Sequence, residues 1–126
     1  MSIVLQSNKL SKWYGNVQGI SEITLEIGAG IFGLLGPNGA GKSTFLKLAS
    51  GQIKPNMGTI EIFGEPVFNR YKLFSRLGFC PEYDTHYPRI SGWEFMLFMA
   101  QGHQIRGKKA HEAAKLALDR VGLWDN

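Results

Sequence analysis

The chain has 126 residues, of which 44% are hydrophobic and 19% charged, with a net charge of +4. This length allows one small domain with the composition of a soluble globular protein. The longest apolar run, Phe95 to Ala100, is too short to span a bilayer, no secretory signal is visible, and the basic residues form no long run that would favour nucleic-acid binding.

The first half of the chain predicts an antiparallel β layer and one strand of a different kind. Residues Ile3 to Leu10 and Val17 to Ile27 alternate apolar and polar side chains, as half-buried strands do. Residues Gly58 to Gly64 alternate in the same way between two glycines. Residues Ile31 to Leu35, in contrast, are continuously apolar apart from Gly33, which favours a strand buried on both faces of a parallel sheet.

A complete phosphate-binding P-loop follows the apolar segment and precedes a predicted helix at residues 44–50. It matches G-x-x-x-x-G-K-[ST] at every fixed position and reads Gly36-Pro37-Asn38-Gly39-Ala40-Gly41-Lys42-Ser43-Thr44. Glycines let the backbone N–H groups turn toward a phosphate at the start of a helix. Lys42 can then reach the β- and γ-phosphates, Ser43 can offer its hydroxyl to Mg²⁺, and Thr44 can contact the inner phosphates. The alternative, a glycine-rich turn with an exposed lysine, does not explain the flanking strand and helix.

The second half is predicted to be mainly helical. A short helix at residues 69–76 leads into a strand at 77–80, which Pro81 ends. The sequence Ser91-Gly92-Trp93-Glu94 is a capping box that predicts a helix start. From 107 to 121, apolar residues form one helical stripe, and Gly122 is the predicted C-terminal cap.

The remaining reactive side chains suggest no separate site. The single cysteine, Cys80, excludes an internal disulfide framework, and its apolar neighbours favour a buried structural thiol over a nucleophile. The three histidines, His86, His103 and His111, lack the spacing of metal ligands, so no zinc site is expected.

Four segments taken in order resemble the first part of an ATP-binding-cassette (ABC) nucleotide-binding domain, and loosely that of ABC-2 type exporters. Besides the P-loop they are Leu10-Ser11-Lys12-Trp13-Tyr14-Gly15, Pro55-Asn56-Met57-Gly58-Thr59-Ile60 and Leu77-Gly78-Phe79-Cys80-Pro81-Glu82. The resemblance covers nearly the whole chain. It implies an α/β P-loop NTPase fold with an N-terminal antiparallel β layer and the start of a helical subdomain, incomplete at the C-terminus. Residues 1–126 would then be the N-terminal part of one ATP-binding domain, with a catalytic core at 1–90 and the helical subdomain beginning at 91–126.

The resemblance also implies roles for two residues outside the P-loop. Tyr14 matches the aromatic residue that stacks on adenine, although Trp13 could take that place instead. Glu82 stands where the family usually has the glutamine that contacts Mg²⁺ and the attacking water. A carboxylate can still face the metal, but it lacks the amide donor and adds negative charge. An exposed loop carboxylate without nucleotide contact is the alternative for Glu82.

The function implied is ATP binding, with Mg²⁺, by the cytoplasmic ATPase subunit of an ABC transporter, lying at the cytoplasmic face of the membrane. Lys42 and Glu82 are the catalytic candidates, and Ser43 and Glu82 the metal ligands. The expected partners are a second ATP-binding subunit and membrane-spanning subunits, with no nucleic acid. The family's signature, Walker B aspartate, catalytic glutamate and switch histidine would follow Asn126, so these residues alone are expected not to hydrolyse ATP. The alternatives are a non-transport ABC protein acting on ribosomes or DNA, and a small P-loop phosphotransferase.

Overall fold

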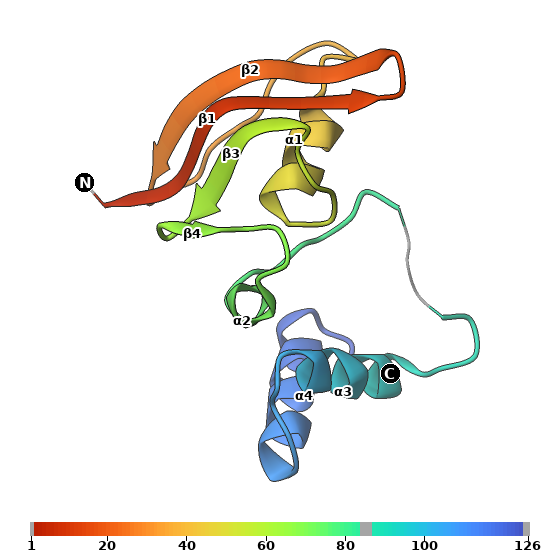
Figure 1. Cartoon of the computed structure of the whole chain (residues 1–126). Coiled ribbons are helices and arrows are strands. Elements are labelled where there is room, and N and C mark those ends of the chain that lie inside the picture. Colours follow the sequence, from red (N-terminus) through yellow and green to blue (C-terminus); the bar gives the residue numbers. More distant parts are fainter. Residues whose placement is uncertain (1, 84–86, 125–126) are drawn as a thin grey trace. The chain divides into compact units, whose positions relative to one another are not determined.

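The computed structural model describes residues 2–83 and 87–124, which form two compact units, 1–73 and 74–126 (Figure 1). Each unit is described by itself. Among the described residues, no helix is long and apolar enough to cross a membrane.

The first unit is built on an antiparallel sheet of strands β1 (Ile3–Tyr14), β2 (Val17–Gly28), β3 (Met57–Ile62) and β4 (Glu65–Pro66). The strand order is β2-β1-β3-β4. β1 pairs with β2 from Ile3 opposite Gly28 to Tyr14 opposite Val17, with shifts of register on the way. Its pairing with β3 ends earlier, at Ser11 opposite Met57. The predicted antiparallel layer is therefore confirmed, and the last residues of β1 extend beyond β3.

Helix α1 (Lys42–Ala49) covers one face of this sheet (Figure 1). The helix buries Phe45 and Leu48 because they lie on the same side, one turn apart. Across from them the sheet contributes Leu10, Ile20, Ile60 and Ile62, and later residues add Val67 and Leu73. This small core holds the start of α1 against β2 and β3. The short helix α2 (Tyr71–Phe74) lies at the boundary between the units and is briefer than the predicted 69–76.

The predicted strand at 31–35 is not formed. Residues 31–35 lie outside every strand of the described chain, and their large side chains are exposed, including Ile31 and Leu35. A strand exists only where a neighbour supplies its hydrogen bonds, and no strand among the described residues pairs with this segment. The apolar run indicates a tendency to be buried. Forming a strand also needs a neighbouring strand, which residues 31–35 do not specify by themselves.

The second unit is a pair of helices, α3 (Gly92–Gly102) and α4 (Lys108–Arg120), that pack on each other. The predicted capping box is confirmed, since Ser91 Oγ accepts from Glu94 N at 3.2 Å and Ser91 N donates to Glu94 Oε2 at 2.8 Å. This backbone bond, followed by the bond from the Ser91 hydroxyl, lowers the pKa of Glu94 from its ordinary value of 4.5. The α4 stripe buries Ala110, Ala114 and Leu118, whereas Val121, which was predicted to belong to it, is exposed.

All three longer helices end in the same way, with a residue in the left-handed region just past the cap. These residues are Gly51, Gln104 and Gly122, with φ of 73°, 62° and 69°. In each case the next residue donates its N–H to the carbonyl of the fifth residue before it, which is the Schellman arrangement. Gly122 was predicted from sequence to end α4. Gln104 was not, because glutamine is not a residue that favours this conformation.

Candidate nucleotide site

The P-loop lies in the first unit and forms a tight turn at the start of α1. Gly39 and Gly41 adopt φ of 84° and 89°, a region that favours glycine. Ala40 N donates to the carbonyl of Pro37 at 3.2 Å, which closes the turn between them. α1 then begins at Lys42 with Gly41 as its N-cap and no side-chain cap.

The start of α1 has the properties of an anion site. The first N–H groups of a helix have no acceptor within the helix, and here no capping side chain accepts from them. They also carry the positive end of the helix dipole. Ser43 is exposed and Thr44 half-exposed, so both hydroxyls lie at the surface beside these donors. Residues 36–40 of the loop, which include Gly36, Asn38 and Ala40, are exposed as well.

Lys42 extends back along the loop that precedes it. Its Nζ donates to the carbonyls of Gly36 and Pro37, at 2.6 and 2.7 Å. The ammonium group therefore lies over the loop and not in bulk solvent. A cation beside the N–H donors at the start of a helix is suited to a group with several anionic oxygens, such as a polyphosphate.

The other side of the loop is packed against strand β2. A Cβ atom on Gly41 would overlap with the carbonyl oxygen of Gly19 and with the Cγ2 methyl of Ile20. A Cβ atom on Gly39, in contrast, would meet no atom within 4 Å. The two glycines therefore serve different purposes. Gly39 provides the turn, and Gly41 also provides the close approach of the loop to the sheet.

Tyr14, the residue predicted to stack on adenine, lies near the first turn of α1. A Cβ atom on Gly19 would be 3.0 Å from Tyr14 Cε2 and 3.1 Å from Thr44 Cγ2, so the ring and the methyl group flank one point. The Tyr14 side chain is 46% exposed, which leaves ring surface for a ligand. No sequence signal marks Gly19 as the residue between them, because this proximity arises only when β2 folds onto α1.

Trp13 occupies a different place. Consecutive residues of a strand point to opposite faces, and Trp13 lines a separate hollow with Lys9, Glu22 and Met57. This arrangement favours Tyr14 over Trp13 as the aromatic residue beside the P-loop.

Glu82 and Cys80 lie in the second unit, on the segment after α2. Glu82 is exposed and belongs to a different unit from the P-loop, so its metal contact stays a prediction. Residues 77–80 do not form the predicted strand. Cys80 is exposed, so the prediction of a buried thiol is wrong. The apolar neighbours that suggested burial are themselves uncovered, as the 47% exposure of Phe79 shows. His86 lies outside the described residues.

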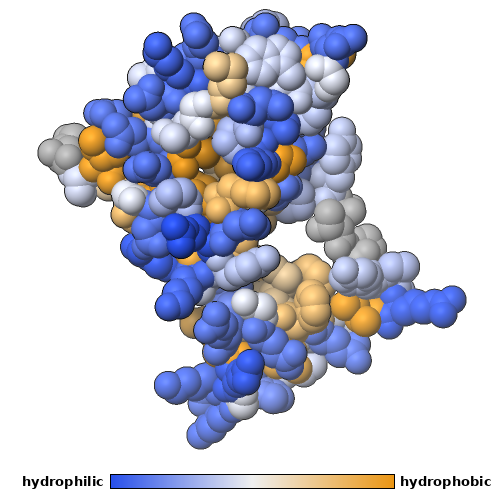
Figure 2. Space-filling view, viewed as in Figure 1, coloured by the Kyte–Doolittle hydropathy of each residue, from blue (hydrophilic) through white to orange (hydrophobic). Residues whose placement is uncertain are grey.

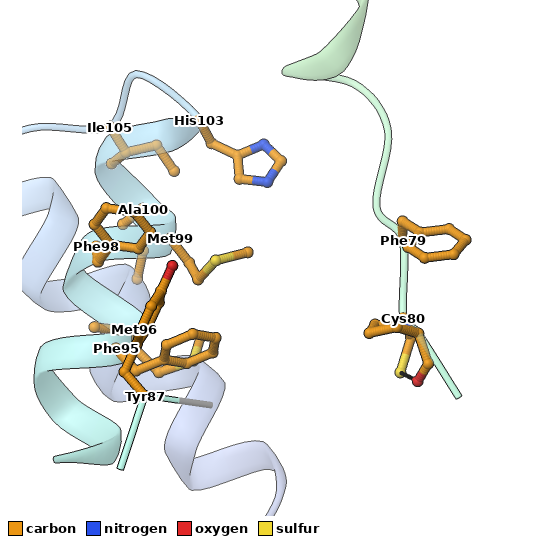
Figure 3. A pocket seen from close by; sticks show the side chains of 13 residues that line it. Phe79, Cys80, Tyr87, Phe95, Met96, Phe98, Met99, Ala100, His103 and Ile105 are labelled. Carbon is orange, nitrogen blue, oxygen red and sulfur yellow. Dashed lines mark hydrogen bonds between the residues drawn. The ribbon is translucent and has the colours of Figure 1, made fainter. Parts of the chain in front are cut away.

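The second unit also has an apolar groove of about 790 Å³. In Figure 3, Phe79 and Cys80 lie across this groove from the side chains of α3, among them Phe95 and Met99. A hydrophobic area is visible over the helical unit in Figure 2. The lining is mainly apolar and provides no cluster of donors for phosphate, so the groove is not a candidate nucleotide site.

The chain is similar in sequence to known proteins over nearly its whole length. Residues 20–126 match a family model described as "ABC transporter". The chain is 35% identical over 125 residues to the bacitracin transport ATP-binding protein BcrA of Bacillus licheniformis, covering 98% of this chain and 40% of that protein. It is 36% identical over 123 residues to the Nod factor export ATP-binding protein I of Sinorhizobium fredii, covering 96% and 36%. The chain thus spans less than half the length of either relative.

A solved structure titled "Structure of ATP binding subunit of ABC transporter" has the same fold. It superimposes with a TM-score of 0.75 at 21% identity, covering 98% of this chain and 52% of that one. The α/β fold with an N-terminal antiparallel layer, expected from the sequence, is therefore confirmed.

Proposed function

The chain belongs to the ABC transporter family, and we propose that its P-loop binds Mg-ATP as part of the ATPase subunit that powers a transporter. Lys42 and the first N–H groups of α1 would hold the phosphates, Ser43 and Glu82 the metal ion, and Tyr14 the adenine. When bound, Mg-ATP supplies the phosphoanhydride whose hydrolysis releases free energy for transport.

The observation that carries this proposal is the convergence of Tyr14 and the P-loop within one unit. The ring of Tyr14 and the methyl group of Thr44 flank the same point beside Gly19. An aromatic face for a base therefore lies next to donors and a cation for phosphates. This is the combination of groups that a nucleoside triphosphate needs and that a free phosphate does not.

The relatives support a role in transport over a role at ribosomes or on DNA. The two curated relatives carry the printed names of transport and export ATP-binding proteins. A second ATP-binding subunit and membrane-spanning subunits are accordingly the proposed partners, and we place the protein at the cytoplasmic face of the membrane through them. The division into a catalytic core at 1–90 and a helical subdomain from 91 remains part of the proposal.

The proposal is tested by calorimetry with Mg-ATP on the native protein and on Lys42→Ala. We expect this variant to lose nearly all affinity, because it removes the cation that lies over the loop. Lys47→Ala is the matched control, since Lys47 is an exposed lysine in the last turn of the same helix. Equal affinity of Lys42→Ala and Lys47→Ala would contradict the P-loop assignment.

We further propose that residues 1–126 by themselves do not hydrolyse ATP, because these residues include no match to the family's Walker B aspartate and adjacent catalytic glutamate, which supply the base for the attacking water. Phosphate release from this fragment is expected to stay at background. Turnover that disappears in Lys42→Ala would show a complete catalytic site within these residues.

A further inference from the structure

We propose that the loop joining α1 to β3 positions the base-binding end of β1, with Asn56 and Lys12 as the positioning residues. This loop, residues 50–56, is called the α1–β3 loop below. The inference rests on the proposed ATP site, in which Tyr14 stacks on the base. It assigns to the two residues a role in holding Tyr14 and no contact with the nucleotide.

Asn56 bonds to β1 where pairing with β3 has stopped. The β1–β3 ladder ends at Ser11 opposite Met57. Just past that point, Asn56 N donates to the carbonyl of Ser11 at 2.9 Å, and Asn56 Oδ1 accepts from Trp13 N at 2.9 Å. The asparagine thus replaces a missing strand neighbour for two residues of β1. Without it, the N–H of Trp13 would have no protein acceptor on that edge among the described contacts.

Lys12 provides a third connection and also faces the Tyr14 ring. Its Nζ donates to the carbonyl of Lys54 at 2.8 Å. The same ammonium lies 5.7 Å from the centroid of the Tyr14 ring, within the range of a cation–π interaction. Lys12 therefore contacts the α1–β3 loop and the base-stacking ring at once.

The other end of the loop is attached to the helix that starts at the P-loop. Gly51 N donates to the carbonyl of Leu48 at 3.1 Å, and Gln52 N to that of Lys47 at 2.9 Å. These bonds fix the direction of the backbone where the loop begins, at the C-terminal end of α1. Helix α1 is itself fixed by buried Phe45 and Leu48. The loop therefore connects the phosphate-binding helix to the strand end that carries Tyr14, and it holds the two at one separation.

This arrangement predicts that disturbing the α1–β3 loop weakens binding of the adenine part of ATP and not binding of the phosphates. In the native protein, Asn56→Ala removes the acceptor for Trp13 N and leaves the P-loop untouched. We expect Mg-ATP affinity to fall about three- to tenfold, the scale of one hydrogen bond, while affinity for tripolyphosphate stays within about twofold. Asn56→Asp keeps an acceptor oxygen and should restore ATP affinity. Lys12→Met should reproduce the selective loss.

The control for the loop itself is Gln52→Ala. The Gln52 side chain is exposed and donates to Ser50 Oγ at 2.8 Å, within the loop and away from β1. This variant should bind ATP and tripolyphosphate as the native protein does. An equal loss of both ligands in Asn56→Ala would overturn the proposal, because it would place the damage in the P-loop. Unchanged ATP affinity would overturn it as well.

A second measurement separates this proposal from that of the ATP site. Hydrogen exchange of the Trp13 amide, followed without nucleotide, should accelerate in Asn56→Ala and not in Gln52→Ala. If it does not accelerate, the Asn56 bond does not hold β1, whatever the protein binds. If exchange accelerates while neither the native protein nor Lys42→Ala binds Mg-ATP, Asn56 does hold β1, but the proposed ATP site is wrong. The role of Asn56 in positioning Tyr14 for a base is then wrong with it.

Discussion

Substituting alanine at Gly41 and at Gly39 separates two effects that the P-loop combines. Both residues adopt left-handed backbone, with φ of 89° and 84°. Alanine in this region costs roughly 1–2 kcal/mol at either position. Only at Gly41 does the added Cβ overlap with other atoms, namely the carbonyl of Gly19 and the methyl group of Ile20.

The overlap at Gly41 makes its substitution the more damaging of the two. Because one of the overlapping atoms belongs to the β2 backbone, the strand or the start of α1 must move. Overpacking of this kind costs about 1–3 kcal/mol beyond the conformational cost. Gly41→Ala should therefore lower the free energy of unfolding by about 2–5 kcal/mol, and Gly39→Ala by about 1–2 kcal/mol.

The assay is urea denaturation of the native protein without nucleotide, comparing the midpoints of the two variants at equal slope. The nucleotide is omitted because Gly39 and Gly41 both belong to the proposed phosphate site. Equal losses in the two variants would refute the reasoning, since they would show that Gly41 is not packed against β2.

Three further outcomes are expected. Tyr14→Ala should weaken Mg-ATP binding by roughly 1–3 kcal/mol, with a mild effect for Tyr14→Phe; calorimetry with tripolyphosphate, which has no base, should show no such loss. Glu82→Gln should keep Mg-ATP binding and leave or raise ATP turnover in the assembled transporter, because it keeps an oxygen ligand and removes a charge; abolished turnover would instead assign acid–base work to Glu82. The ionised form of Glu94 stabilises α3, since its folded pKa lies below 4.5. This contribution is present above pH 4.5 and disappears as pH falls through the folded pKa, so the difference in urea midpoint between the native protein and Glu94→Gln should shrink in acid.

Features that depend on neighbours in the sequence were predictable. The capping box at Ser91 and Glu94 involves residues three positions apart, and both of its bonds are present. The alternation in β1, β2 and β3 reflects one buried face, and the P-loop spacing places Gly41 at the N-cap of α1. Each of these patterns reflects the geometry of residues that are close together in the sequence.

Features that depend on distant partners were not predictable in the same way. The apolar run at 31–35 indicates a tendency to be buried, but a strand needs a partner that its own residues do not specify. Cys80 was expected to be buried for the same reason and is exposed. The proximity of Tyr14 to Thr44 likewise depends on how β2 folds onto α1, and it became evident only from the structure.

The length of α1 has a consequence for how this segment can vary. The helix has eight residues, so its axis spans about 12 Å. A left-handed glycine stands on each side of it, Gly41 directly before and Gly51 after the C-cap. Inserting or deleting one residue would rotate the following chain by about 100° and shift it by about 1.5 Å. Either change would turn Leu48 away from the sheet or carry Asn56 away from Trp13. Variation within α1 should therefore occur by substitution on its exposed side, for example at Leu46, and not by a change in the number of residues.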